Sequence, residues 1–187
     1  MSALVLEQRL IQILQTNKNL IRDLEVVESL GLPQWCIAAG YVRNYVWDYL
    51  HGYTPRASLN DVDVLYFDPT DLREETEKTY ESALKGKVAE YKWSVKNQAR
   101  MHTMNQNHPY IDVADAMKRW PETATATGVS FDHNGNLNII APHGLEDLFN
   151  LVVRKSPYFI DRDYFYKRIE RKGWLTMWPK LIVEEVV

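Results

Sequence analysis

Two aspartates, Asp61 and Asp63, stand two positions apart in the segment Asp61-Val62-Asp63-Val64. On an extended strand, residues at i and i+2 point from the same face, so the two carboxylates would lie side by side. Carboxylate oxygens are ligands that Mg²⁺ prefers, and substrate phosphates commonly complete its coordination. Ions held in this way activate an attacking hydroxyl and neutralise a leaving group. The spacing therefore predicts a Mg²⁺ (or Mn²⁺) site at Asp61 and Asp63.

A glycine at a predicted strand-to-helix turn offers a second site element. Gly40 follows the apolar run 35–39 and precedes a helical stretch, residues 42–50. Glycine lets a ligand approach the backbone, and a helix N-terminus presents free amide protons and the positive end of its dipole. Gly40, Tyr41 and Arg43 are therefore the candidate phosphate-binding residues. The alternatives are a turn without a ligand at Gly40 and an internal ion pair for Arg43.

Alternating residues over 91–102 predict a long strand beside the aspartates. One face of that strand would carry four polar or cationic side chains, namely Lys96, Gln98, Arg100 and His102. In a cleft, Lys96 or Arg100 would stabilise charge developing on a leaving pyrophosphate. Asn97 and Gln98 are the candidate nucleotide contacts of this segment. The alternative is a solvated strand face.

The elements that must position these residues indicate one mixed α+β unit. Apolar residues at three- and four-residue steps predict N-terminal helices within residues 1–30. Further strands are expected at 35–39, 61–67, 127–131 and 137–140, the last two joined by an Asn-Gly hairpin. Further helices are expected at 42–50, 71–85, 113–120, 145–150 and 161–172. Without internal repeats or a linker, residues 1–187 are expected to form a single domain with the N-terminal helices packed on it.

Two further segments have less specific patterns. Thr123, Thr125 and Thr127 alternate with alanines and are interpreted as residues of a packed strand, with the cleft wall as the alternative. The basic run 168–172 is interpreted as a solvated helix face.

Composition restricts the partners. The 22 basic and 25 acidic residues give a net charge of -3, so no global attraction to nucleic acid arises and no DNA partner is expected. The single cysteine, Cys36, lies in an apolar run and is expected to be a buried structural thiol. No segment approaches the ~18 apolar residues that cross a bilayer. With no secretion signal visible either, we expect a cytoplasmic protein without a membrane partner.

The turn Gly40-Tyr41-Val42-Arg43-Asn44 and the pair Asp61-Val62-Asp63-Val64 resemble a known signature. It is the Gly-Gly-x-Val-Arg-Asp and Asp-x-Asp signature of tRNA CCA-adding enzymes and bacterial poly(A) polymerases. From about residue 35 to 179 the chain is also similar to a bacterial group of small nucleotidyltransferase-like proteins of unassigned substrate. The segments that carry this second resemblance are 93–102, 120–129 and 141–149. All these proteins are members of the DNA polymerase β-like nucleotidyltransferase superfamily.

The resemblance implies the polymerase β-like fold, a mixed sheet flanked by helices. It also implies Mg²⁺-dependent transfer of a nucleotidyl group from an NTP with release of pyrophosphate. Two departures stand out, because Tyr41 replaces the second glycine of the turn and Asn44 stands where the tRNA enzymes carry aspartate. Many members use a third carboxylate on a later strand; here Ser94, Asn97 or Asp112 would take its place.

The acceptor is open among RNA, a protein hydroxyl and a small molecule. The negative net charge and the absence of a large C-terminal RNA-binding domain argue against a long RNA. A catalytically silent fold that binds a nucleotide or a partner is the rival interpretation, and a toxin-like enzyme modifying tRNA or protein is the third.

Overall fold

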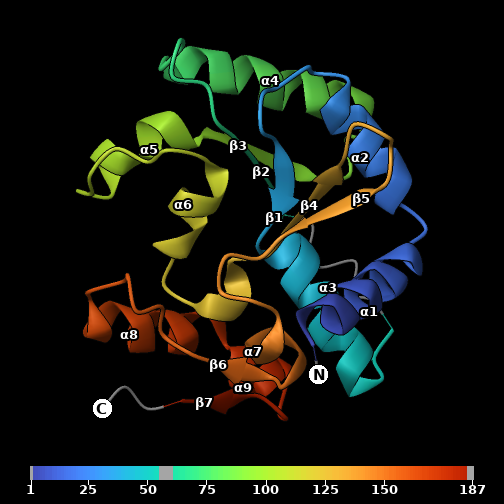
Figure 1. The fold of residues 1–187 in the computed structure, drawn as a ribbon, viewed down its shortest axis with the longest axis vertical. Coiled ribbons are helices and arrows are strands. Elements are labelled where there is room, and N and C mark those ends of the chain that lie inside the picture. Colours follow the sequence, from blue (N-terminus) through green and yellow to red (C-terminus); the bar gives the residue numbers. More distant parts are fainter. Residues whose placement is uncertain (1, 55–60, 185–187) are drawn as a thin grey trace.

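The computed structural model describes residues 2–54 and 61–184 (Figure 1). Its helices are α1 (Ala3–Gln15), α2 (Leu20–Glu28), α3 (Gly40–His51), α4 (Glu74–Lys87), α5 (Gln98–Met104), α6 (Val113–Lys118), α7 (Glu146–Phe149), α8 (Arg162–Lys172) and α9 (Trp174–Met177), with a 3-10 turn η1 (Thr123–Thr125). Its strands are β1 (Cys36–Ala38), β2 (Asp61–Tyr66), β3 (Lys92–Asn97), β4 (Gly128–Phe131), β5 (Leu137–Ile140), β6 (Val152–Val153) and β7 (Ile182–Val183). The loop predicted before Asp61 includes residues 55–60, which lie outside the described residues.

The main sheet has five strands in the order β3-β2-β1-β4-β5. Strands β2 and β3 run parallel, whereas β1 is antiparallel to both β2 and β4. β4 and β5 form the predicted antiparallel hairpin, with Gly135 at a positive φ of 78° in its turn. A separate pair, β6 and β7, is parallel and lies with α7, α8 and α9 below the main sheet in Figure 1. The predicted mixed sheet flanked by helices is confirmed.

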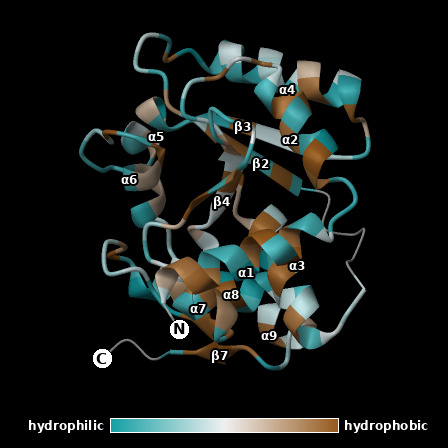
Figure 2. Cartoon of the chain, turned by 45° about the vertical axis from the view of Figure 1, so that its right-hand side comes forward, coloured by the Kyte–Doolittle hydropathy of each residue, from teal (hydrophilic) through white to brown (hydrophobic). Residues whose placement is uncertain are grey.

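The two faces of the sheet bury different sets of side chains. Val62, Val64 and Val95 point into the large core, which the apolar sides of α1 to α4 also enter. The opposite face carries Asp61 and Asp63 at one end and a smaller cluster beneath α6. Figure 2 shows hydrophobic colour on the central strands and also on α1 and α3, while α4 carries both colours along its length. An aspartate pair at the edge of a packed face is therefore held by a rigid strand.

The long strand predicted over 91–102 is wrong in its second half. β3 ends at Asn97 and helix α5 begins at Gln98. The Asn97 side chain is the N-cap of α5, because its Oδ1 accepts from the amide of Ala99 at 3.1 Å. The alternation of apolar and polar residues continues beyond Asn97, but the backbone there changes from strand to helix. The cationic row Lys96, Gln98, Arg100 and His102 therefore does not exist as one strand face.

The outer edge of β3 is covered by helix α4. The amides of Val95 and Asn97, which face no further strand, donate to the carboxylates of Glu81 and Glu77 at 2.9 and 3.0 Å. Unpaired edge amides are a liability in sheets, and side-chain acceptors remove it here. In the part of the chain that the structure describes, no helix combines the length and apolarity that a membrane span needs.

Candidate active site

Asp61 and Asp63 lie on the same face of β2, as the spacing predicts. Asp63 pairs across the sheet with Ala38 of β1 and with Ser94 of β3. The two carboxylates have different surroundings: the Asp61 side chain is 72% exposed and lies 3.8 Å from Lys92 Nζ, whereas Asp63 is half-buried. One carboxylate thus faces solvent and the other lies at the base of the site.

Burial raises the pKa of Asp63 above its ordinary value. A hydrogen bond from the Ser94 hydroxyl and the charges of Arg43 and Lys172 act in the opposite direction, while Asp61 adds to the rise. Desolvation penalises the ionised carboxylate, and nearby cations compensate only in part. A divalent cation beside Asp63 would complete that compensation.

The turn between β1 and α3 is tighter than the sequence suggests. Ala39, the N-cap of α3, has φ 57° and ψ -124°, a conformation that L-residues rarely adopt. A Cβ at Gly40 would lie 3.0 Å from Asn44 Nδ2, so Gly40 also lets the first turn of α3 close on itself. Ala39 directly follows Ala38, which pairs with Asp63 across β1 and β2. The N-terminus of α3 therefore lies beside the aspartates.

The side chain of Tyr41 has a hydrogen-bond partner within the fold. It lies in the first turn of α3, and its hydroxyl donates to Asp23 Oδ2 of α2 at 2.8 Å. The six-residue pattern Gly-Gly-x-Val-Arg-Asp falls on residues 39–44, so Ala39 replaces a glycine and Tyr41 takes the variable position. The departure from the family pattern therefore lies at Ala39 and not at Tyr41, and Ala39 is also the residue with a positive φ.

Arg43 is buried beneath the N-terminus of α3 and has no direct ion pair among the described residues. Its Nη1 donates to Thr125 Oγ1 at 2.7 Å, and its Nε and Nη2 donate to Asn44 Oδ1. Its guanidinium lies 4.3 Å from the ring centroid of Trp174. Burial lowers the pKa of Arg43 to about 10. Arg43 therefore acts first as a structural cation, close enough to Asp63 to lower the pKa of that carboxyl.

A series of polar contacts continues from Arg43 to the C-terminal layer, which is formed by α7, α8, α9, β6 and β7. Thr125 Oγ1 donates to Glu122 Oε2 at 2.9 Å, and Arg168 Nε of α8 donates to Glu122 Oε1 at 2.7 Å. Thr125 lies in the 3-10 turn η1 and not in a strand, which corrects the packed-strand interpretation of residues 123–127. Arg168 is likewise not part of a solvated face, because it holds the buried Glu122.

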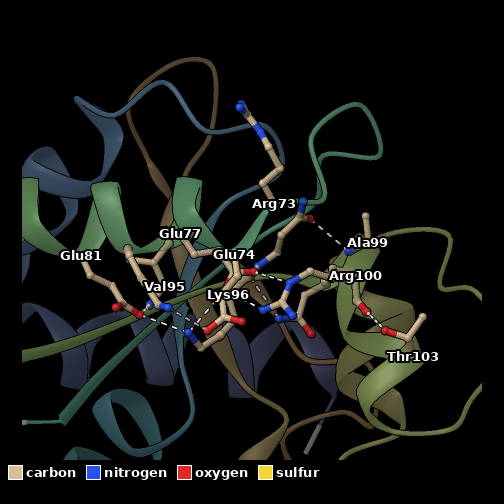
Figure 3. A network of polar contacts seen from close by, with 12 residues as sticks. Arg73, Glu74, Glu77, Glu81, Val95, Lys96, Ala99, Arg100 and Thr103 are labelled. Carbon is tan, nitrogen blue, oxygen red and sulfur yellow. Dashed lines mark hydrogen bonds and ion pairs between the residues drawn. The ribbon is translucent and has the colours of Figure 1, made fainter.

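Lys96 and Arg100 are held by carboxylates of α4 (Figure 3). Arg100 Nη2 lies 2.8 Å from Glu77 Oε2, and Lys96 Nζ lies 3.4 Å from the same oxygen and 3.2 Å from Glu81 Oε1. Glu77 is fully buried, so its charge is matched by these cations. The structure therefore brings Lys96 and Arg100 to Glu77 and not to the aspartate pair.

Asn97 and Gln98 also have structural partners. Asn97 Oδ1 accepts from the amides of Asp68 and Ala99, and its Nδ2 donates to the carbonyls of Asp68 and Asp71. Its side-chain capacity is thus filled within the fold, on the sheet face opposite Asp63. Gln98 is buried and donates to the carbonyl of Lys96 at 3.1 Å.

Of the three candidates for the place of a third carboxylate, Ser94 pairs with Asp63 across β2 and β3. Asp112 instead is the N-cap of α6, accepting from the amide of Asp115 at 2.6 Å, and lines a hollow with Ser130 and Asn138. Over residues 2–54 and 61–184, no group of three or more histidine, cysteine or acidic side chains forms a metal cluster. Two carboxylates suit Mg²⁺ nonetheless, since it often binds one or two of them together with substrate phosphates.

Sequence reasoning missed Glu122, and it named Ser94 and Thr125 without their partners. The only signal at Glu122 is an acidic residue between Pro121 and an alanine-threonine run, which does not reveal its contacts with Thr125 and Arg168. Cys36, by contrast, is a buried free thiol as predicted, and burial raises its pKa to about 12.

Comparison with known proteins decides the family. A profile described as nucleotidyltransferase matches residues 25–183. An NMR structure, described as revealing a CCA-adding enzyme head domain, is 30% identical with a TM-score of 0.84, covering 96% of this chain and 96% of that chain. This chain belongs to the nucleotidyltransferase family. No protein of curated function matches it.

Larger solved enzymes share the fold of this nucleotidyltransferase. A CCA-adding enzyme complexed with CTP has a TM-score of 0.56 at 14% identity, covering 93% of this chain and 43% of that chain. A tRNA nucleotidyltransferase complexed with a primer tRNA and an incoming ATP analog has a TM-score of 0.50 at 20% identity, covering 87% and 46%. This nucleotidyltransferase thus spans less than half the length of these two enzymes, and they show its fold alone.

Proposed function

We propose that this nucleotidyltransferase is a Mg²⁺-dependent enzyme that transfers a nucleotidyl group from an NTP to an acceptor hydroxyl and releases pyrophosphate. The observation that carries the proposal is the placement of Asp61 and Asp63 on one face of β2, beside the N-terminus of α3. Carboxylates for a hard cation and free helix amides for phosphates converge there.

Each element of the site would have a separate task. Asp61 and Asp63 would hold the cation, which supplies charge neutralisation at the phosphates when bound. The first turn of α3 would receive the triphosphate on its amides, with Gly40 allowing close approach. Arg43, held by Thr125 and Asn44, supports that turn from beneath. Ser94 orients the Asp63 carboxylate.

A thermal-shift titration with the four NTPs, with and without Mg²⁺ or Mn²⁺, tests the site. A ligand at about 100-fold above its Kd should stabilise the fold by ~2.7 kcal/mol. We expect a metal-dependent shift in the wild type and its loss in Asp63→Asn. The control Asp163→Asn, an exposed carboxylate on α8, should keep the shift. An equal NTP shift in both variants would remove Asp63 from the site.

The acceptor is tested with an NTP labelled at the α-phosphate and separate pools of small RNA, protein and metabolites. The net charge of -3 favours a protein hydroxyl or a small molecule over a long RNA. Label in one pool, dependent on Asp63, would identify the acceptor class.

A catalytically silent nucleotide-binding fold is the second candidate. Within the described residues, no third carboxylate joins Asp61 and Asp63, and this observation favours it. Metal-dependent NTP binding without pyrophosphate release, across all acceptor pools, would support the silent fold over the enzyme.

A further inference from the structure

The three cations that the sequence offers for phosphate binding already have partners within the fold. Arg43 donates to Thr125 and Asn44. Lys96 and Arg100 lie on the carboxylates of Glu77 and Glu81, at the edge of β3. If Lys96 or Arg100 moved to a phosphate, the buried Glu77 would lose one of its counter-charges. An unpaired charge in a protein interior is strongly destabilising. A nucleotide at the aspartate pair therefore needs a cation from another element.

Helix α8 provides one from the C-terminal layer. Lys172, its last residue, is exposed and forms no ion pair among the described residues. It stands four residues after Arg168, so both side chains leave the same flank of the helix. Arg168 fixes the direction of that flank, because it binds the buried Glu122 at 2.7 Å.

The contacts around Lys172 lead directly to the candidate site. Glu122 is joined through Thr125 to Arg43, and Trp174, two residues after Lys172, stacks on the same guanidinium at 4.3 Å. Arg43 lies under the first turn of α3, next to the β1 residue that pairs with Asp63. Lys172 is thus held on the rim of the site by contacts on both sides of it in the chain.

We propose that Lys172 is the cation that binds the phosphates of the substrate nucleotide beside Asp61 and Asp63. This inference rests on the proposed function and names a residue for it that differs from Lys96 and Arg100. An ammonium group on a flexible stem suits this role, since it follows a phosphate as a point charge. The C-terminal end of α8 also favours a cation, so Lys172 costs the fold nothing there.

The test is calorimetric titration of Mg²⁺ with inorganic tripolyphosphate, and separately of Mg²⁺ with an NTP, into the full chain. We expect Lys172→Ala to weaken the Kd for both about tenfold, because one charge-assisted contact is lost. Lys172→Arg should restore most of the affinity. The matched control Lys167→Ala removes the same charge from an exposed position on the same helix, about 140° around it, and should change neither Kd.

The outcomes separate the two proposals. Wild-type binding that Lys172→Ala leaves unchanged would overturn the role of Lys172 and leave the proposed function standing. A loss as large in Lys167→Ala as in Lys172→Ala would show a general charge effect and also overturn it. A wild type that binds neither tripolyphosphate nor an NTP would overturn both proposals. Circular dichroism of each variant confirms that the fold is intact.

Discussion

At the scale of single residues, the site contains two positions that oppose stability. Asp63 is a half-buried carboxylate whose pKa is raised by desolvation, and Ala39 has a backbone conformation suited to glycine. Buried charges and strained backbone concentrate at functional sites, where they are kept for a reason other than folding. Both features lie next to the N-terminus of α3, and this coincidence supports the location of the proposed site.

Replacing Asp63 by asparagine should therefore stabilise the metal-free protein, by about 1 kcal/mol, because a partly desolvated charge is removed. The folded state raises the pKa of Asp63, so its favourable contribution is present below the carboxyl's unfolded pKa and is lost as pH rises through the folded value. The advantage of Asp63→Asn should shrink as pH falls toward that range. Urea denaturation in EDTA at several pH values measures it; a destabilised Asp63→Asn at neutral pH would contradict the prediction.

Ala39→Gly should also stabilise the protein. Positive-φ strain costs about 1–3 kcal/mol, and the extra chain entropy of glycine returns about 0.5–1 kcal/mol, so a net gain of about 1 kcal/mol is expected. Ala126→Gly is the control, because Ala126 is buried with an ordinary φ of -77° and should lose stability on the same change. Equal losses at both positions in urea denaturation would show that Ala39 is not strained.

At the scale of elements, one side chain decides how β3 ends. Asn97 caps α5 through one hydrogen bond and ties the loop at Asp68 and Asp71 to the sheet through three more. The same junction directs Arg100 toward Glu77 on α4. Asn97 thus holds together three segments: the end of β3, the start of α5 and the loop that leads from β2 to α4.

Asn97→Ala should cost about 3 kcal/mol, since it leaves buried backbone groups unsatisfied and removes a helix cap. Asn105→Ala is a suitable comparison, because Asn105 is exposed and its amide makes one 3.2 Å hydrogen bond to Tyr110. That change should stay within about 0.5 kcal/mol. Chemical denaturation of both variants measures the difference, and similar small effects would mean that the junction is not held by Asn97.

At the scale of the whole molecule, the C-terminal layer is joined to the sheet through α3. Trp47 packs edge-on against Trp174 and Trp178, and Trp178 Nε1 donates to Asp48 Oδ1 at 2.8 Å. The buried chain from Arg43 to Arg168 adds a polar connection beside these rings. Apolar packing and a buried polar network at one junction favour cooperative folding of both layers.

The chain should therefore unfold in urea as a single cooperative unit, as predicted for one domain. Tryptophan fluorescence, to which three of the six tryptophans contribute from this junction, and far-UV circular dichroism should give superimposable transitions. Glu122→Gln should weaken the junction and lower both midpoints together, because it removes the buried partner of Arg168. A fluorescence transition at clearly lower urea than the dichroism transition would show that the C-terminal layer unfolds separately.

The sequence by itself determined the order of the main elements and the aspartate pair. Strand alternation at Asp61 and Asp63 and the glycine after an apolar run depend on residues close together in the chain, where periodicity and turn chemistry act directly. The hairpin at Gly135 was predictable for the same reason. The family resemblance added the fold on which these local features lie.

The tertiary structure alone decided which charged groups belong to the site. Lys96 and Arg100 lie in the segment that the pattern placed beside the aspartates, yet Glu77 binds them. The cation proposed in their place, Lys172, comes from the far end of the chain. A pattern of charges does not encode its partners, because ion pairing depends on distances that only the packed chain fixes. The end of β3 at Asn97 could not be predicted for the same reason. The alternating sequence is typical of a strand, and only the packed chain brings the loop at Asp68 to the Asn97 side chain.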